Sequence, residues 1–125
     1  MTSTQTEFQE TFAHLKVVLT PYAPRLICTE ETPEHFSLDT PYVMQSGKHL
    51  DFGSVQIRKR YVSFHLMPVY VDPSLLDGIS DSLRKRMQGK SCFNFKAVDK
   101  ALFDELSNLV KAGHAMYRKE GYLKS

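Results

Sequence analysis

The apolar residues of one segment change parity part-way along it, and this pattern constrains the fold more than any other. Within residues 48–58 the apolar positions are, in order, Leu50, Phe52, Val55 and Ile57. In a regular strand, a step of one residue turns the following side chains to the opposite face. A β-bulge near Gly53 and Ser54 would keep these apolar residues together. We therefore predict a bulged strand whose two halves share one core face.

The residues that follow predict the second strand of a hairpin. Arg58-Lys59-Arg60 supplies the turn, and the strand after it alternates strictly. Because alternate side chains of a strand point to opposite faces, one set should lie in the core and the other outside it. The core set is Val62, Phe64 and Leu66, and the outer set is Tyr61, Ser63, His65 and Met67.

The N-terminal third predicts a helix followed by short strands. A capping-box spacing begins at Thr4, an apolar stripe recurs every three or four residues, and Pro21 ends the helix. We expect short strands at Arg25–Thr29 and His35–Asp39. Between them, Thr32-Pro33-Glu34 has the pattern of a capped turn with proline at the first helical position.

The C-terminal half predicts two short helices, one strand and a long final helix. Asp72-Pro73 begins the first short helix, and Ser80 caps a second one that Gly89 ends. The segment Cys92–Phe95 alternates as a strand does, and Asp99–Glu120 carries the apolar stripe of a helix. The strand has Phe93 and Phe95 on one face, and Cys92 and Asn94 on the other.

Together these elements predict an α+β fold. We expect a single small antiparallel sheet, with the N-terminal helix and the long C-terminal helix packed on one face. A chain of 125 residues is long enough to form one hydrophobic core. Residues 1–125 are therefore predicted to be a single domain, with residues 1–5 flexible.

The cysteines and the N-terminus predict a cytoplasmic protein. Cys28 and Cys92 lie far apart and form no CxxC motif, so a structural disulfide is not expected. The first residues lack the basic start and apolar run of a secretory signal. The apolar runs of the chain are far too short to span a membrane.

Basic residues are concentrated in the middle of the chain. Residues 1–54 contain three bases and seven acids, whereas residues 55–100 contain nine bases and four acids. Such a segment can attract an anion or a nucleic-acid backbone. Its one combination of bases with an aromatic residue, Arg58-Lys59-Arg60-Tyr61, is equally typical of a solvated hairpin tip. We interpret the bases as dispersed over several loops and expect no nucleic-acid partner.

The sheet face opposite the core is the candidate ligand site. His65 and Tyr61 lie on it, and Cys92 and Asn94 should share it. Such a partly apolar face indicates a covering element, a subunit contact or a ligand groove. Lys90 is expected near a helix end, where it can meet helical carbonyls or a ligand anion. Cys92 and His65 would permit nucleophilic chemistry, although a lone strand cysteine is usually a small buried hydrophobe. The candidate ligand-binding residues are thus Tyr61, His65, Lys90, Cys92 and Asn94.

A second cluster predicts an alternative, metal-binding site. Glu30, Glu31, Glu34 and His35 place three carboxylates and an imidazole within residues 30–35. Carboxylate oxygens are the donors that a hard metal ion accepts. Pro33 interrupts any single helix that would align these side chains, and acids near a helix start are also stabilised by the helix dipole.

From about Phe12 to Leu123 the chain resembles the YdhG-like family of bacterial domains. The resemblance is carried by PYAPRL at Pro21–Leu26, by GKHLDFGSVQIRKRYVSFHLMPVY at Gly47–Tyr70, and by RMQGKSCFNF at Arg86–Phe95. It implies a compact α+β domain similar in shape to frataxins. One branch of the family is associated with iron delivery, so the resemblance implies iron as the cargo of the alternative site.

The sequence carries no recognised catalytic signature. We therefore expect a non-enzymatic module without a cofactor, which binds a small molecule or a protein in the cytoplasm. The alternative is an intracellular iron chaperone of frataxin type. Both a monomer and a homodimer remain open.

Overall fold

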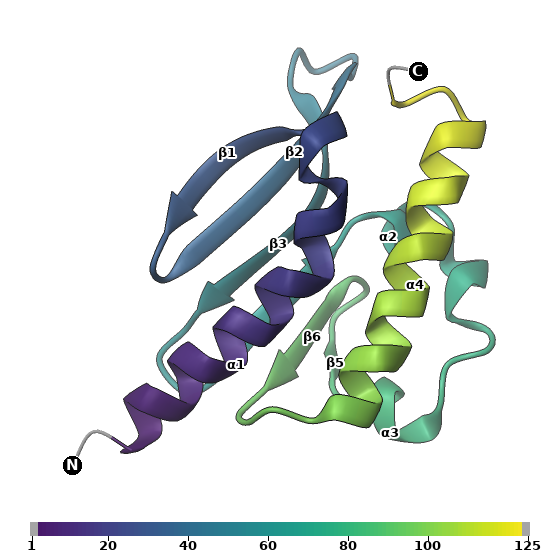
Figure 1. Cartoon of the computed structure of the whole chain (residues 1–125). Coiled ribbons are helices and arrows are strands. Elements are labelled where there is room, and N and C mark those ends of the chain that lie inside the picture. Colours follow the sequence, from purple (N-terminus) through teal and green to yellow (C-terminus); the bar gives the residue numbers. More distant parts are fainter. Residues whose placement is uncertain (1–2, 124–125) are drawn as a thin grey trace.

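A single antiparallel sheet of six strands organises the fold, and helices α1 (Ser3–Leu19) and α4 (Lys100–Lys119) lie side by side against one of its faces (Figure 1). The structure, a computed structural model, describes residues 3–123. The predicted α+β class, with one antiparallel sheet and two terminal helices, is confirmed. The strands lie in the order β1–β2–β3–β4–β6–β5. Their bounds are β1 Ile27–Thr32, β2 His35–Val43, β3 His49–Ile57, β4 Val62–Leu66, β5 Met87–Gln88 and β6 Cys92–Phe95.

Short helices connect the longer elements. Their bounds are η1 Thr20–Arg25, α2 Pro68–Val71, η2 Pro73–Leu76 and α3 Asp81–Arg84. The predicted caps form: Asp72 accepts from the backbone N–H of Ser74, and Ser80 accepts from that of Leu83. Among residues 3–123, no helix has both the length and the apolar composition needed to cross a membrane. The prediction that residues 1–5 are flexible includes residues 1–2, which lie outside the described range, and it stays a prediction.

The core lies between the sheet and the two long helices. Val55, Phe64 and Phe93 are fully buried, and they face one another across β3, β4 and β6. Leu15 of α1 and Leu106 of α4 are also fully buried and belong to the same cluster. Alternate side chains of β4 are only partly buried, because they point to the opposite face of the sheet.

The bulge predicted from the parity change is present in β3. Leu38 pairs with Gly53 while its neighbour Asp39 pairs with Asp51, so Phe52 is the extra residue. Phe52, Gly53 and Val55 are all buried. The glycine is required here because a Cβ atom on Gly53 would lie 2.9 Å from Cδ2 of Leu19 and 3.3 Å from the carbonyl oxygen of His65. The bulge begins one residue before the predicted position.

The turn predicted at Thr32-Pro33-Glu34 does not begin a helix. It joins β1 to β2, with Thr32 paired to His35, and the N–H of Glu34 donates to the hydroxyl of Thr32 at 3.2 Å. Proline and the capping pattern suit a tight hairpin turn as well as a helix start. The strand predicted at His35–Asp39 continues through Pro41 to Val43, and the strand predicted at Arg25–Thr29 begins later, after η1.

The helix predicted to run from Ser80 to Gly89 is wrong in its second half. The helix α3 ends at Arg84, and Met87 and Gln88 form the short strand β5. Gly89 has a φ of +77° in the turn between β5 and β6. A glycine with positive φ ends helices and also closes hairpins, so the residue alone does not decide between them.

The close approach of α4 to α2 generates a stability prediction. A Cβ atom on Gly113 would lie 2.7 Å from Cβ and 3.0 Å from Cγ of Pro68, whose ring cannot rotate away. Overpacking should outweigh the higher helix propensity of alanine, so Gly113→Ala should lower the free energy of unfolding by about 1–2 kcal/mol in a urea titration. Gly78→Ala is the control because no atom lies within 4 Å of its added Cβ. Equal stability of the two variants would contradict the packing argument.

Candidate functional site

The register between β4 and β6 brings His65 and Cys92 together on the sheet face opposite the core, which we call the open face. His65 pairs directly with Cys92, and Ser63 pairs with Asn94. Side chains directly opposite in an antiparallel pair lie on the same face, about 5 Å apart. On β4, Phe64 lies between Ser63 and His65 and points into the core instead. The alternation that buries the core therefore also places His65 beside Cys92.

The β3 bulge brings a carboxylate to the same place. Asp51 lies one residue before the extra residue Phe52, and Ser54 lies two residues after it. Although they are three positions apart, both side chains face away from the core. Asp51 is thereby close enough for its Oδ2 to lie 3.1 Å from Nε2 of His65. Asp51 was not among the candidate residues, although it alternates with the apolar Leu50 and Phe52 and therefore belonged to the outer face.

The second ring nitrogen of His65 meets a hydroxyl and a thiol. Nδ1 lies 3.1 Å from Oγ of Ser91 and 3.6 Å from Sγ of Cys92. His65 is thus held at both ring nitrogens, with its side chain 23% exposed. Ser91 was also missed from the sequence, because its place beside His65 depends on the turn between β5 and β6. The result is a carboxylate–imidazole–thiol arrangement at the surface of the sheet.

These contacts favour the charged forms of all three groups. The hydrogen bond to Asp51, and then that to Cys92, raises the pKa of His65 to about 9. The hydrogen bond to His65 in turn lowers the pKa of Asp51. It also lowers the pKa of the Cys92 thiol, against the opposing effect of burial. At neutral pH, His65 is therefore an imidazolium beside a carboxylate, and its charge favours the thiolate of Cys92.

His65 and Cys92 line a shallow cavity, which we call the open-face cavity. Its volume is ≈ 330 Å³, and strands β3, β4 and β6 form its floor. Of the predicted residues, Tyr61, His65, Cys92 and Asn94 line it. Lys90 does not: it is exposed in the turn between β5 and β6, so its predicted place near a helix end is wrong. Arg58 and Gln88 complete the rim, and Asn94 donates to Gln88 at 2.6 Å.

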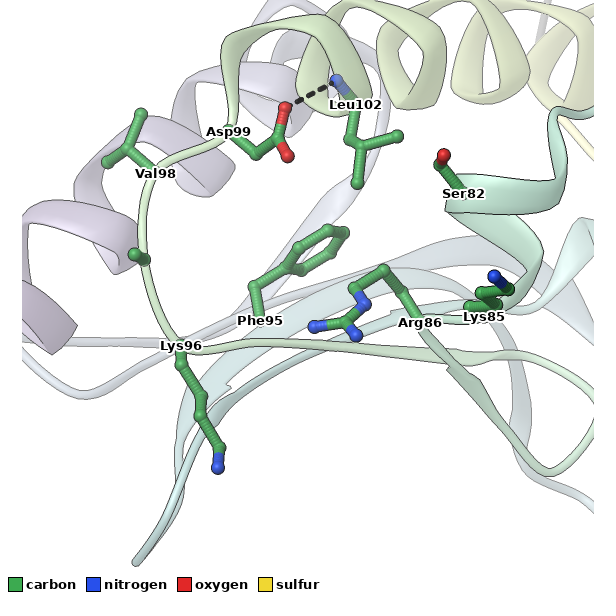
Figure 2. A pocket seen from close by; sticks show the side chains of 9 residues that line it. Ser82, Lys85, Arg86, Phe95, Lys96, Val98, Asp99 and Leu102 are labelled. Carbon is green, nitrogen blue, oxygen red and sulfur yellow. Dashed lines mark hydrogen bonds between the residues drawn. The ribbon is translucent and has the colours of Figure 1, made fainter.

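A second depression adjoins the first at the sheet edge, and we call it the edge cavity. It has a volume of ≈ 320 Å³ and shares Tyr61, Gln88 and Asn94 with the open-face cavity. Its basic lining residues are Lys85, Arg86 and Lys96. The same bases border a third cavity between the sheet and the start of α4, where Figure 2 shows Phe95 pointing toward Leu102 and Lys96 pointing away from the helix. Asp99 is engaged there as the cap of α4, accepting from the N–H of Leu102 at 3.2 Å.

The predicted metal residues lie on the β1–β2 hairpin, at the other end of the strand order. Glu31 forms an ion pair with Lys16 at 3.0 Å, and Glu30 alternates with it along β1. Within the described part of the chain, no group of three or more His, Cys, Asp or Glu side chains is placed to hold a metal ion. Binding at Glu30, Glu31, Glu34 and His35 stays a prediction.

Comparisons with known proteins identify no relative of the chain. No protein-family model, no curated protein and no solved structure matches it. The resemblance to the YdhG-like family therefore stays a prediction.

The contacts of His65 generate a prediction for its titration. In an NMR pH titration of the ring resonances, His65 should titrate with a pKa of about 9, because Asp51 and Cys92 stabilise its charged form. Asp51→Asn removes the main cause, so the pKa of His65 should fall. His114 is the internal control: burial lowers its pKa, so it should titrate below the usual 6.5 in the same spectra. A pKa near 6.5 for His65 would show that the three groups are not coupled.

Proposed function

We propose that the chain is a non-enzymatic module that binds a small anionic molecule in the open-face cavity. The observation that carries the proposal is the imidazolium of His65, held by Asp51 at 3.1 Å in a concave site with a basic margin. The proposal retains the predicted ligand-binding role of Tyr61, His65, Cys92 and Asn94. It excludes Lys90 from direct contact.

The size and lining of the cavity favour a small polar ligand. Its volume of ≈ 330 Å³ is at the lower end of the range for ligand sites in proteins. Its floor is polar and offers hydrogen bonds from serine, amide and imidazole side chains, among them Ser54, Gln56 and Ser63. A ligand with several polar oxygens fits such a surface better than a hydrophobic one.

The charges around the site favour an anion. Arg58 lines the open-face cavity, and Lys85, Arg86 and Lys96 line the edge cavity beside it. Among the described residues, no carboxylate lines either cavity. Opposite charges a few ångströms apart attract by about 1 kcal/mol even in water, so several bases together can select an anion.

The state of His65 favours binding over turnover. A general base has to be unprotonated near the working pH and free to reach the substrate. With a pKa of about 9, His65 carries its proton at neutral pH, and both ring nitrogens already have partners. The proposed role is therefore to attract and orient a ligand. A cytoplasmic location is part of the proposal, since Cys28 and Cys92 are both free thiols.

An NMR titration with inorganic pyrophosphate tests this proposal. At constant ionic strength, pyrophosphate should shift the backbone amides of Arg58, Gln88 and Asn94, whereas the cation spermidine should not. Arg86→Gln should weaken pyrophosphate binding roughly fivefold, because one attractive charge of about 1 kcal/mol is removed. Lys119→Gln is the matched control: it removes the same charge in the last turn of α4.

Two outcomes would contradict the proposal. Equal weakening by Arg86→Gln and Lys119→Gln would indicate attraction to the overall charge of the chain instead of a site. Shifts confined to the β1–β2 hairpin would move the anion away from the open face altogether.

A further inference from the structure

We propose that Cys92 is a thiol–disulfide exchange site, and that its substrate is an anionic disulfide of low molecular weight. The inference rests on the proposed function, because the same basic margin brings the substrate to the thiol. It adds a covalent step to that site. The product is the chain carrying half of the disulfide on Cys92.

The surroundings of Cys92 are those of a reactive thiol. The side chain is half-buried and lines the open-face cavity, so a ligand can reach Sγ. Sγ lies 3.6 Å from Nδ1 of the His65 imidazole, whose other nitrogen is held by Asp51. A thiol beside an imidazolium is present more fully as the thiolate, which is the nucleophile in exchange. A purely structural cysteine would instead be enclosed by apolar side chains.

The sheet favours disulfide exchange over acyl transfer at this thiol. Acyl transfer requires donors aimed at the oxyanion that forms on the substrate. Cys92 lies on β6, which is paired with β4 on one side and with β5 on the other. Backbone N–H groups of such a strand lie in the plane of the sheet, while the thiol points out of it. Exchange at sulfur needs only an accessible thiolate and a leaving thiolate.

The step balances without a further reactant. The Cys92 thiolate attacks one sulfur of the disulfide RS–SR, a bond forms between Sγ and that sulfur, and the bond between the two substrate sulfurs breaks. The leaving group departs as the thiolate RS⁻ with the electron pair of that bond. Cys92 is oxidised to the mixed disulfide, one half of the substrate is reduced, and the net charge is unchanged. His65 retains its proton throughout.

The modification has to be reversed by a thiol from outside the chain. Cys28 lies on β1, and the strand order separates it from Cys92 by four spacings of about 4.8 Å, or roughly 19 Å. A disulfide requires Cα atoms within about 7 Å, so Cys28 cannot resolve the adduct within one chain. A small external thiolate attacks the substrate-derived sulfur instead, and Cys92 returns to the thiolate.

The bases at the margin select the charge of the disulfide. Arg58 in the open-face cavity and Arg86 and Lys96 in the edge cavity can hold carboxylates of a substrate whose sulfur lies over Cys92. They also stabilise the thiolate that leaves. A cationic disulfide would be repelled by the same residues.

The rates of adduct formation test the inference. The full chain with Cys28→Ser, in which Cys92 is the single cysteine, is mixed at pH 6.5 with oxidised glutathione or with cystamine, and adducts are followed by intact mass. Each rate is divided by the rate of the same disulfide with 2-mercaptoethanol. The normalised rate should be about tenfold higher for anionic oxidised glutathione than for cationic cystamine. His65→Gln should lower the glutathione rate at pH 6.5 severalfold, because the hydrogen bond and charge that lower the pKa of the Cys92 thiol are removed and less of it is present as the thiolate.

A spectroscopic readout separates this role from that of an ordinary exposed thiol. Formation of the adduct removes the thiolate beside His65, so the pKa of His65, about 9 in the free chain, should fall when Cys92 carries glutathione. Absence of an adduct, or an unchanged rate with His65→Gln, would overturn the inference. Equal normalised rates for the two disulfides would overturn the anionic substrate.

Failure of this inference can be told apart from failure of the proposed function. Cys92→Ser cannot form an adduct at position 92 but retains Arg58, Arg86 and Lys96, so it should still bind pyrophosphate in the NMR titration. Binding by Cys92→Ser without an adduct on the Cys28→Ser chain would overturn the exchange step alone. Loss of pyrophosphate binding by every variant, and by the unmodified chain, would overturn both.

Discussion

The extra residue in β3 is the constraint on which the rest of this structure depends. By inserting Phe52 into the strand, the chain keeps Phe52 and Val55 in the core and also turns Asp51 and Ser54 to the open face. One local irregularity thereby serves both sides of the sheet. Gly53 makes it possible, since the end of α1 and the carbonyl oxygen of His65 leave no room for a side chain there. The site and the packing of α1 are for this reason parts of the same arrangement.

Charge is distributed unevenly across the open face, with acids at one side and bases at the other. Asp39 and Asp51 lie opposite one another on β2 and β3, and burial, together with the nearby Asp51 carboxylate, raises the pKa of Asp39. The bases Arg86 and Lys96 lie at the other edge, beyond β6. His65 is between these regions and is bonded to the acidic one. In the proposed binding mode, an anionic ligand would therefore lie toward β5, with its reactive or polar centre over β4 and β6.

Local alternation predicted the faces of the strands, and it failed where the partner of a strand mattered. Val62–Leu66 and Cys92–Phe95 alternate clearly, so the outer position of His65, Cys92 and Asn94 followed from the residues themselves. Which strands are neighbours depends on packing of the whole chain, and so the contact of Asp51 with His65 was not foreseen. Ser80 and Gly89 are equally compatible with a helix and with a helix followed by a hairpin, which is why β5 was missed and Lys90 misplaced.

Asp51 connects the open face to the helical layer through two different atoms. Its carboxylate binds His65, while its backbone carbonyl oxygen accepts a hydrogen bond of 3.0 Å from the hydroxyl of the fully buried Tyr117 on α4. Asp51 therefore contributes both to the packing of α4 on the sheet and to the ionisation state of His65. If the two contacts of Asp51 are coupled, thermodynamic reciprocity requires the effect of charge at His65 on the packing of α4 to equal, in size and sign, the effect of that packing on the charge at His65. Asp51 thus gives the two faces of this small sheet a direct physical connection through a single residue.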